Sequence, residues 1–249
     1  MFARKPKVGA QKKRAKPATA RELLAIDGEK VAVNVRFNPR ARRMVMRIHP
    51  VTGEVTVTAP ARTGMAQAMA FARGESLWIA RQREAAPPAI AFAPGSVVPF
   101  GGVPHRICVS VHKGPAPVWR EDGQIYVSGK PEHAARRLTD FFKREAKKAL
   151  EIRAVELGAA LGVRPSRVTV RDTASRWGSC SAARSLSFSW RLIFAPEFVR
   201  DYVVAHEVAH LKEMNHGPKF WAHVQSLNSD DKRARRWLRE HGRGLLRYN

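Results

Sequence analysis

Two histidines and a glutamate lie close together in an apolar stretch of the chain. His206, Glu207 and His210 form the pattern His-Glu-x-x-His within residues 202–211. In an α-helix, residues i and i+4 lie one turn apart on the same face, so both imidazoles can point at a single metal ion. Glu207 lies about 100° further around the helix, where its carboxylate can address a water molecule bound to that metal. The pattern predicts a zinc centre of the hydrolase type, with His206 and His210 as metal ligands and Glu207 as the catalytic residue.

A hydrolytic zinc site usually has a third protein ligand and leaves the fourth position to water. In an unbroken helix, His216 would lie about 15 Å along the axis from His206 and could not share its metal. Asn215, Gly217 and Pro218 are residue types that end one helix and begin another, so we expect a bend that returns His216 to the metal. His216 is the preferred third ligand. The other downstream candidates are Glu213, the geometric runner-up on nearly the same helical face as His206, and His223, Asp230, Asp231, Glu240 and His241.

The helix that must carry this pattern has a well-marked start. Pro196 stands at the first helical position and Glu197 adds a negative charge to the first turn. Apolar residues then cover most of the helix circumference, which predicts a buried helix. Ionisable side chains on a buried helix need compensation, and metal ligation supplies it. These apolar residues are Phe198, Val199, Tyr202, Val203, Val204, Val208 and Leu211.

Residues 175–181 precede this helix and have the composition of a loop that approaches a ligand closely, because Trp177 lies among small residues. In residues 185–192, Leu186, Phe188 and Trp190 alternate with polar residues, mostly serines, which predicts a strand with one polar face. An exposed edge on that strand could accept an extended peptide by strand addition. A half-buried structural hairpin fits the same pattern.

The rest of the chain predicts an α+β protein. Short alternating runs at residues 31–37, 44–48 and 55–58 predict an antiparallel meander, followed by a helix from Thr63 to about residue 83 that Gly74 weakens. Further strands are expected at 107–111, 124–127 and 168–170, and an amphipathic helix at 131–161. The predicted domains are a disordered basic tail (1–20), an N-terminal antiparallel β-rich region (21–130) and a zincin-like metallopeptidase domain with a small sheet and an active-site helix (131–249).

The chain is strongly basic. Its 249 residues contain 45 Lys and Arg against 21 Asp and Glu, a formal net charge of +24. Such a charge indicates attraction to polyanions, including nucleic acid, but an ordinary solvated surface fits it equally well. The same two interpretations apply to the basic segments 1–20 and 230–247.

Two features indicate a reducing compartment and no membrane. Cys108 and Cys180 lie far apart and neither belongs to a Cys-x-x-Cys pair, so no disulfide framework or cysteine zinc module is expected. No run reaches the roughly 18 apolar residues of a membrane span, and the basic N-terminal segment lacks the apolar core of a secretory signal. We expect a cytoplasmic protein with unknown oligomeric state.

Three motifs together resemble the YgjP-like metallopeptidases, bacterial relatives of the SprT and Wss-type zinc proteases. They are residues 176–180 (Arg-Trp-Gly-Ser-Cys), the serine-rich strand ending at Leu192, and the histidine pattern followed by His216-Gly217-x-x-Phe220-Trp221. The resemblance implies His206, His210 and His216 as zinc ligands and Glu207 as the catalytic residue, in agreement with the helical spacing. It also makes proteolysis associated with DNA conceivable.

The function predicted from these observations is zinc-dependent hydrolysis of peptide bonds. Zinc on three neutral imidazoles lowers the pKa of bound water toward about 7, and Glu207 takes the proton of that water and passes it to the leaving amine. Candidates for stabilising the oxyanion are Arg176, Arg191 and Tyr202. The alternatives are a nucleic-acid-associated protease of the SprT type and a polyanion-binding protein with a vestigial zinc site. The predicted partner is a protein or peptide substrate.

Overall fold

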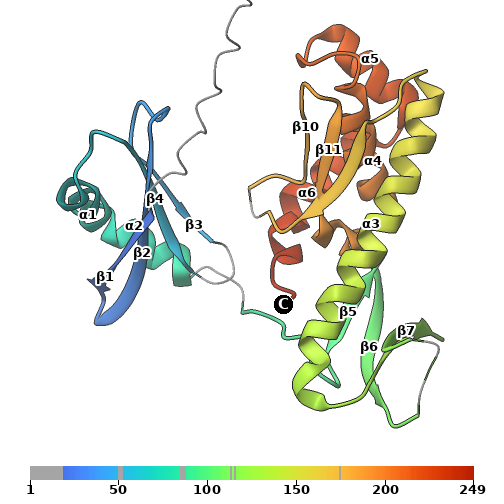
Figure 1. Ribbon diagram of the computed structural model, residues 1–249, viewed down its shortest axis with the longest axis horizontal. Helices are drawn as coiled ribbons and strands as arrows, with labels where there is room; N and C mark the ends of the chain where they lie inside the picture. Colours follow the sequence, from blue (N-terminus) through green and yellow to red (C-terminus); the bar gives the residue numbers. More distant parts are fainter. Residues whose placement is uncertain (1–18, 50–52, 85–87, 113, 115, 174) are drawn as a thin grey trace, which may run out of the picture. The chain divides into compact units, whose positions relative to one another are not determined.

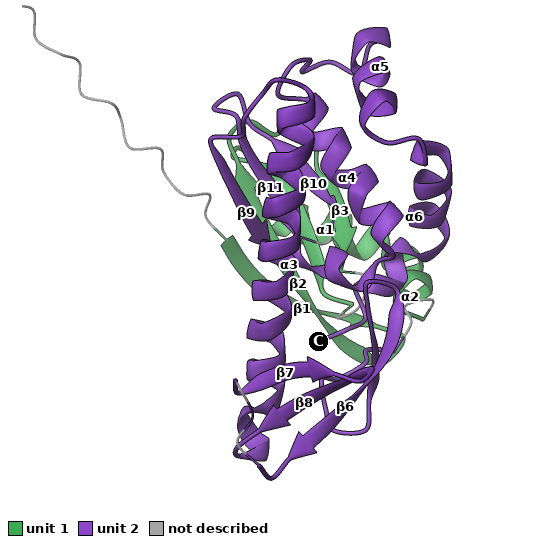
Figure 2. Cartoon of the chain, turned by 90° about the vertical axis from the view of Figure 1, so that its right-hand side faces the viewer, with its two compact units in different colours: residues 1–49, 53–85 green, residues 50–52, 86–249 purple. Residues whose placement is uncertain are grey.

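The chain divides into two compact units that contain both helices and strands. The computed structural model describes residues 19–49, 53–84, 88–112, 114, 116–173 and 175–249. Unit 1 comprises residues 1–49 and 53–85, and unit 2 comprises residues 50–52 and 86–249 (Figure 1 and Figure 2). The predicted α+β class is confirmed. The tail predicted over residues 1–20 lies outside the described residues except for Thr19 and Ala20, which begin the first strand.

Unit 1 is built on a four-stranded sheet with the order β1-β2-β4-β3. Its strands are β1 (Thr19–Ile26), β2 (Glu29–Asn38), β3 (Val45–Ile48) and β4 (Val55–Pro60). A tight turn through Asp27 and Gly28, both with positive φ, joins β1 to β2 as a hairpin.

The predicted antiparallel meander is wrong for one strand pair in this sheet, because β2 and β4 run parallel. The chain places β4 between β2 and β3 rather than at the edge. Burial explains this order: Val55, Val57 and Ala59 of β4 are fully buried, whereas no residue of β3 is buried. The strand with the more apolar inward face takes the inner position.

Two helices pack against this sheet where a single one was predicted over residues 63–83. They are α1 (Met65–Gly74) and α2 (Ser76–Glu84), and Glu75 between them caps the C-terminus of α1. The low helix propensity of Gly74 agrees with a break at this position. Ala68, Met69 and Ala72 of α1 join the buried face of the sheet.

Unit 2 begins with a second four-stranded sheet, of order β5-β6-β8-β7. Its strands are β5 (Val97–Phe100), β6 (Val103–Ser110), β7 (Val118–Glu121) and β8 (Gln124–Ser128). The sequence assigned these strands to an N-terminal region ending at residue 130. In the structure they form one core with helix α3 (Ala134–Ala160), which contacts β7 and β8. The boundary between the compact units therefore lies near residue 86 rather than at 130/131.

The long helix α3 is shared by both sheets of unit 2. Its apolar face, with Leu138, Phe142 and Leu150 fully buried, follows the predicted amphipathic pattern. Besides the first sheet, α3 contacts β9 (Arg167–Arg171), the 3-10 segment η2 (Trp190–Phe194) and helix α4 (Glu197–Ala209). Thus α3 supports the elements that carry the predicted site.

The second sheet of unit 2 is small and lies next to α4. It has the order β10-β11-β9, with β10 (Gly178–Cys180) antiparallel and β9 parallel to β11 (Ser185–Ser189). Of the two interpretations of the serine-rich strand, the exposed edge is wrong, because β11 pairs on both sides, and the antiparallel pairing with β10 agrees with a structural hairpin. The two outer strands are β10, which contacts α4, and β9, which contacts α3.

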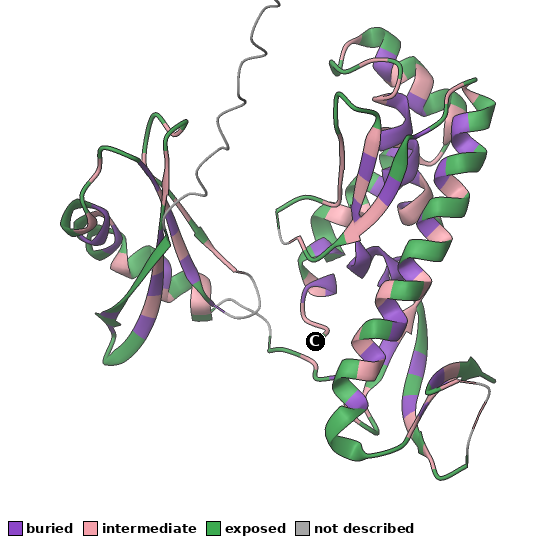
Figure 3. Cartoon of the chain, in the orientation of Figure 1, coloured by how far each residue is buried: buried purple, intermediate pink, exposed green. Residues whose placement is uncertain are grey.

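Three helices complete unit 2. Helix α4 is mostly buried, as predicted, and packs against α3, α5 (Pro218–Leu227) and α6 (Asp231–Leu245) (Figure 3). None of the helices in the described ranges is long and apolar enough to cross a membrane.

Candidate metal centre

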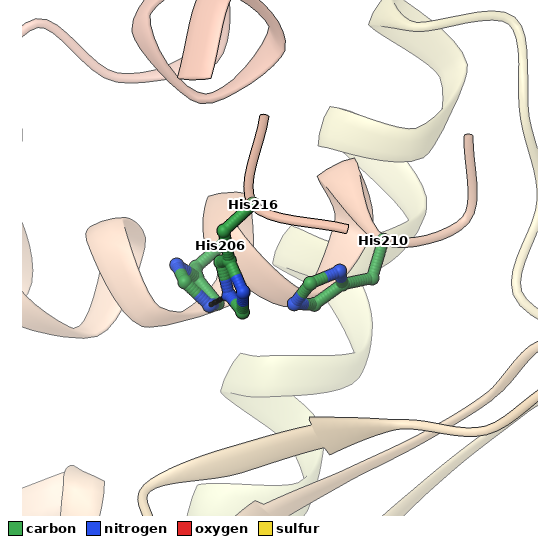
Figure 4. Close-up of side chains that lie close together, drawn as sticks. All are labelled: His206, His210 and His216. Atoms are coloured by element: carbon green, nitrogen blue, oxygen red, sulfur yellow. Dashed lines mark hydrogen bonds between the residues drawn. The ribbon is translucent and has the colours of Figure 1, made fainter. Parts of the chain in front are cut away.

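Three histidines converge at the C-terminal end of α4. His206 lies in its last turn, His210 caps its C-terminus, and His216 comes from the loop before α5. One ligand nitrogen from each ring lies within 4.8 Å of the other two, and the rings face one another (Figure 4). The structure thus brings together the three residues that the sequence predicted as metal ligands.

The bend that returns His216 to α4 depends on short-range backbone hydrogen bonds. The amide of Glu213 donates to the carbonyl of Ala209, and the amide of Gly217 donates to the carbonyl of Asn215. Gly217 then serves as the N-cap of α5, with Pro218 in the first helical turn. Gly217 and Pro218 therefore begin α5 as predicted, whereas α4 ends at Ala209, before Asn215 is reached.

Glu213, the runner-up ligand, contributes its backbone rather than its carboxylate. Its carbonyl oxygen lies 3.0 Å from His210 Nδ1. A carbonyl can only accept, so Nδ1 carries the proton and the lone pair of His210 is on Nε2. This contact fixes the ring in the tautomer that can bind a metal through Nε2. The other downstream candidates (His223, Asp230, Asp231, Glu240 and His241) do not belong to the cluster among the described residues.

The donor atoms fit a tetrahedral metal ion. Nε2 of His206 and Nε2 of His216 lie 3.1 Å apart. Two nitrogens bound to one tetrahedral zinc ion at about 2.0–2.1 Å would lie about 3.3 Å apart. Burial, followed by the neighbouring charges of His210 and His216, lowers the pKa of His206 to about 4, and burial lowers the pKa of His210. Both rings are therefore neutral near pH 7, as ligation requires.

The aromatic ring of Phe220 packs against the imidazole rings of all three histidines. The ring of Phe220, which is fully buried, lies 4.5 Å from that of His210, 4.7 Å from that of His216 and 4.9 Å from that of His206 between centroids. Because α5 carries Phe220, packing of this helix orients the histidines. In the sequence, Phe220 stands out only as part of a family motif, although its spacing of four residues from His216 is the signal that could have suggested this role.

Glu207 lies next to His206 in the chain and is largely buried. Its side chain is buried, and Oε2 has no hydrogen-bond partner among the described residues. Burial raises the pKa of Glu207 to about 7, while the positive charge of Arg176 opposes the rise. A carboxylate with this pKa can both accept and release a proton near neutral pH.

The backbone of β10 fixes the position of this carboxylate. A Cβ atom at Gly178 would lie 2.5 Å from both Cγ and Oε1 of Glu207, closer than real Cβ contacts. Only glycine at position 178 lets the glutamate lie against the strand. The small residues of this loop predicted a close approach to a ligand, whereas the closest approach that the structure shows for Gly178 is to Glu207.

We expect Gly178→Ala to lower peptide cleavage by about 10²-fold without loss of metal, since a displacement of the carboxylate by about 1 Å is enough for such an effect. The measurements are metal content and kcat/KM on one peptide. Gly244→Ala, at a helical position with open space around it, is the matched control. Full activity of Gly178→Ala would contradict the assigned contact.

A cavity of about 460 Å³ adjoins Glu207 and His206. Its walls come from α4, from the start of β10 with the loop before it, and from α6. Two of the three predicted oxyanion candidates, Arg176 and Tyr202, line it. Trp177 and Gly178 of the loop that was expected to approach a ligand also line it, and so do four residues that the sequence did not indicate: Val203, Arg235, Leu238 and Arg239.

The third oxyanion candidate, Arg191, has a structural role instead. Its guanidinium is buried, pairs with Asp172 at 3.0 Å between Nε and Oδ1, and donates to the carbonyl of Tyr248. It does not line the cavity.

Three histidines around one point beside a buried glutamate define a site of the metal-dependent hydrolase class. Comparison with protein families agrees: residues 42–241 match the YgjP-like family, metallopeptidase domain. The match covers most of the chain and includes the entire candidate centre, so the chain belongs to the YgjP-like metallopeptidase family. Neither the curated proteins nor the solved structures yielded a match.

Proposed function

We propose that this protein is a zinc-dependent peptidase in which His206, His210 and His216 hold the metal and Glu207 transfers the proton. The observation that carries the proposal is the convergence of three imidazole nitrogens beside a buried carboxylate. Membership of a metallopeptidase family supports a metal and a peptide substrate. A protein or peptide is therefore the substrate that we propose.

Zinc is the metal that suits the donors best. Three imidazoles without a carboxylate differ from the two-histidine, one-carboxylate set of non-haem iron enzymes. Three protein ligands also leave a tetrahedral ion one open position, as in catalytic zinc sites. When bound, zinc supplies a Lewis acid that polarises the scissile carbonyl and makes water more acidic.

The protein groups perform the remaining steps. Oε2 of Glu207, which has no partner among the described residues, accepts the proton of the attacking water and then donates it to the leaving amine. Arg176 and Tyr202 line the adjoining cavity and can orient the carbonyl oxygen. The outer strand β10, beside α4, offers backbone groups with which an extended peptide can align.

Metal analysis combined with a cleavage assay tests this proposal. We expect about one zinc ion per chain. Cleaved peptides from a diverse library would be identified by mass spectrometry; a chelator should stop cleavage and added zinc should restore it. A native protein that contains no zinc, and whose metal-free form takes up none, would contradict the proposal.

The nucleic-acid alternative rests on the exposed basic residues of α6, among them Lys232, Arg236 and Arg243. It requires binding to mixed-sequence DNA that weakens steeply as salt rises, because released counterions drive such binding. Absence of binding at low salt would leave the net charge of +24 as a general surface property.

A further inference from the structure

The cavity beside the histidine cluster is strongly basic. Arg176 lies on one wall, in the loop before β10, and Arg235 and Arg239 lie on another, in α6. Glu207 is the only acidic residue among those that line it. A cavity with three guanidinium groups and one carboxylate, which the proposed mechanism already uses, is suited to an anionic ligand.

The two arginines of α6 are placed on the cavity by helix geometry. Arg235 and Arg239 are four residues apart and therefore share a face, with Leu238 beside them. The guanidinium carbon of Arg235 lies 5.0 Å from the centroid of the Trp221 ring, which orients this side chain by a cation–π contact. The arginines thus approach the site from the helix that follows α5.

These three arginines, unlike several other arginines of unit 2, have no acidic partner in the part of the chain that the structure describes. Arg153 pairs with Asp201, Arg191 pairs with Asp172, and Arg233 approaches Asp230. No ion pair involves Arg176, Arg235 or Arg239 within the described part of the chain. Their donors are therefore available to a ligand.

The basic lining continues onto the face of the small sheet. A neighbouring groove shares Arg176 and Gly178 with the cavity and is also lined by Arg167 and Arg171 of β9. Its other lining residues are Thr169, Thr173, Ser179, Cys180, Ser181, Ser185 and Ser187, none of which is acidic. A chain lying along β10 would therefore meet positive charge on both sides of Glu207.

We propose that the cavity binds a carboxylate of the peptide substrate next to the scissile bond, supplied by an Asp or Glu side chain or by the free C-terminus. This proposal rests on the peptidase function proposed above and defines its substrate class as acidic peptides. The three arginines select the charge by hydrogen bonds to the carboxylate, while Trp177, Val203 and Leu238 contact the aliphatic part of the residue.

The shape of the site favours a peptide over a nucleic acid. The cavity is lined by His206 and Glu207 and, at about 460 Å³, has room for a side chain or a chain end rather than for a run of phosphates. A nucleic-acid site would be expected to present aromatic platforms for successive bases. In this cavity, Trp177 is held by packing against Gly242 of α6, where a Cβ atom would lie 3.2 Å from its ring.

Peptide pairs that differ only in charge test the proposal. The zinc-loaded protein is given a randomised peptide library, in free-acid and C-terminally amidated forms, and each cleaved bond is mapped by mass spectrometry. We expect Asp or Glu near the cleaved bond, or a free C-terminus, to raise kcat/KM about tenfold or more over the Gln, Asn or amidated counterpart. Comparison of the two library forms distinguishes side-chain from C-terminal carboxylates.

Substitutions on α6 test whether the cavity arginines cause the preference for acidic peptides. Arg239→Gln and the double variant Arg235→Gln/Arg239→Gln should bring the ratio of rates for the Glu and Gln peptides toward one. Arg236→Gln removes the same charge from the same helix outside the cavity and should leave the ratio unchanged. Circular dichroism verifies folding of each variant. Equal rates for acidic and neutral peptides in wild type, or a preference that survives both substitutions, would overturn the proposal.

Binding measurements separate this proposal from the peptidase function. Fluorescence anisotropy compares labelled Glu- and Gln-containing peptides on Glu207→Gln protein, with a mixed-sequence DNA oligonucleotide as competitor. Acid-selective binding that depends on Arg239, together with a zinc-loaded wild-type protein that cleaves no peptide, would contradict the peptidase proposal but support the carboxylate site. Cleavage by wild type without acid-selective binding would support the peptidase proposal and contradict the carboxylate site. Displacement of the peptide by DNA, with DNA binding lost in Arg239→Gln, would assign the cavity to phosphate and overturn the carboxylate proposal.

Discussion

Replacement of Glu207 by glutamine is expected to lower peptide cleavage by about 10²- to 10⁴-fold while the protein keeps its metal. Glutamine has nearly the same shape, so it fits against Gly178 as glutamate does. Its amide cannot accept the proton of water, so only the proton transfer is lost. The three histidine donors are unchanged.

The measurements for Glu207→Gln are kcat/KM on one cleaved peptide and metal content per chain. Glu197→Gln is a matched control, because Glu197 lies in the first turn of the same helix, with its side chain 79% exposed. This control should keep both activity and metal. Undiminished cleavage by a zinc-loaded Glu207→Gln protein would show that another group moves the proton.

Replacement of His216 by alanine is expected to abolish stable metal binding and with it the stabilisation that metal provides. A ligand that binds only the folded protein raises the free energy of unfolding by about 4 kcal/mol when its free concentration is 1,000 times its Kd. For a domain of this size, that corresponds to a rise in Tm of about 8–16 °C. His216 is exposed, so its removal costs little packing. The stability that the variant loses therefore measures the contribution of the bound metal.

Thermal unfolding with zinc and with a chelator checks this expectation. Wild type should show the difference in Tm, whereas His216→Ala should unfold at the same temperature in both conditions. His223→Ala provides the control, since His223 belongs to the same region but lies outside the cluster. A His216→Ala protein that binds zinc as tightly as wild type would remove His216 from the ligand set that we propose.

The predictions that the structure reproduces depend on short-range chemistry. The spacing of His206 and His210 fixes their common face, and Gly217 and Pro218 begin α5 directly after His216. Each of these relations is encoded within a few residues of helix and turn. The buried character of α4 followed in the same way from its apolar circumference.

The features that sequence reasoning missed depend on contacts between distant segments. Which strand takes the inner position in a sheet depends on competition among strands, so neither the inner place of β4 nor that of β11 could be predicted from its own pattern. The limit of unit 2 near residue 86 depends on packing of β7 and β8 against α3. Arg235 and Arg239 meet Arg176 only because α6 folds back onto α4.

The contact between Gly178 and Glu207 also limits how sequences of this kind can diverge. Because the carboxylate itself occupies the space that a side chain at 178 would need, the two positions must change together or the reaction is lost. A relative that keeps the three histidines but carries a larger residue at the position of Gly178 is expected to be a pseudoenzyme that retains its metal. Position 178 thus provides a marker for sorting catalytic from non-catalytic sequences that the histidine pattern cannot distinguish.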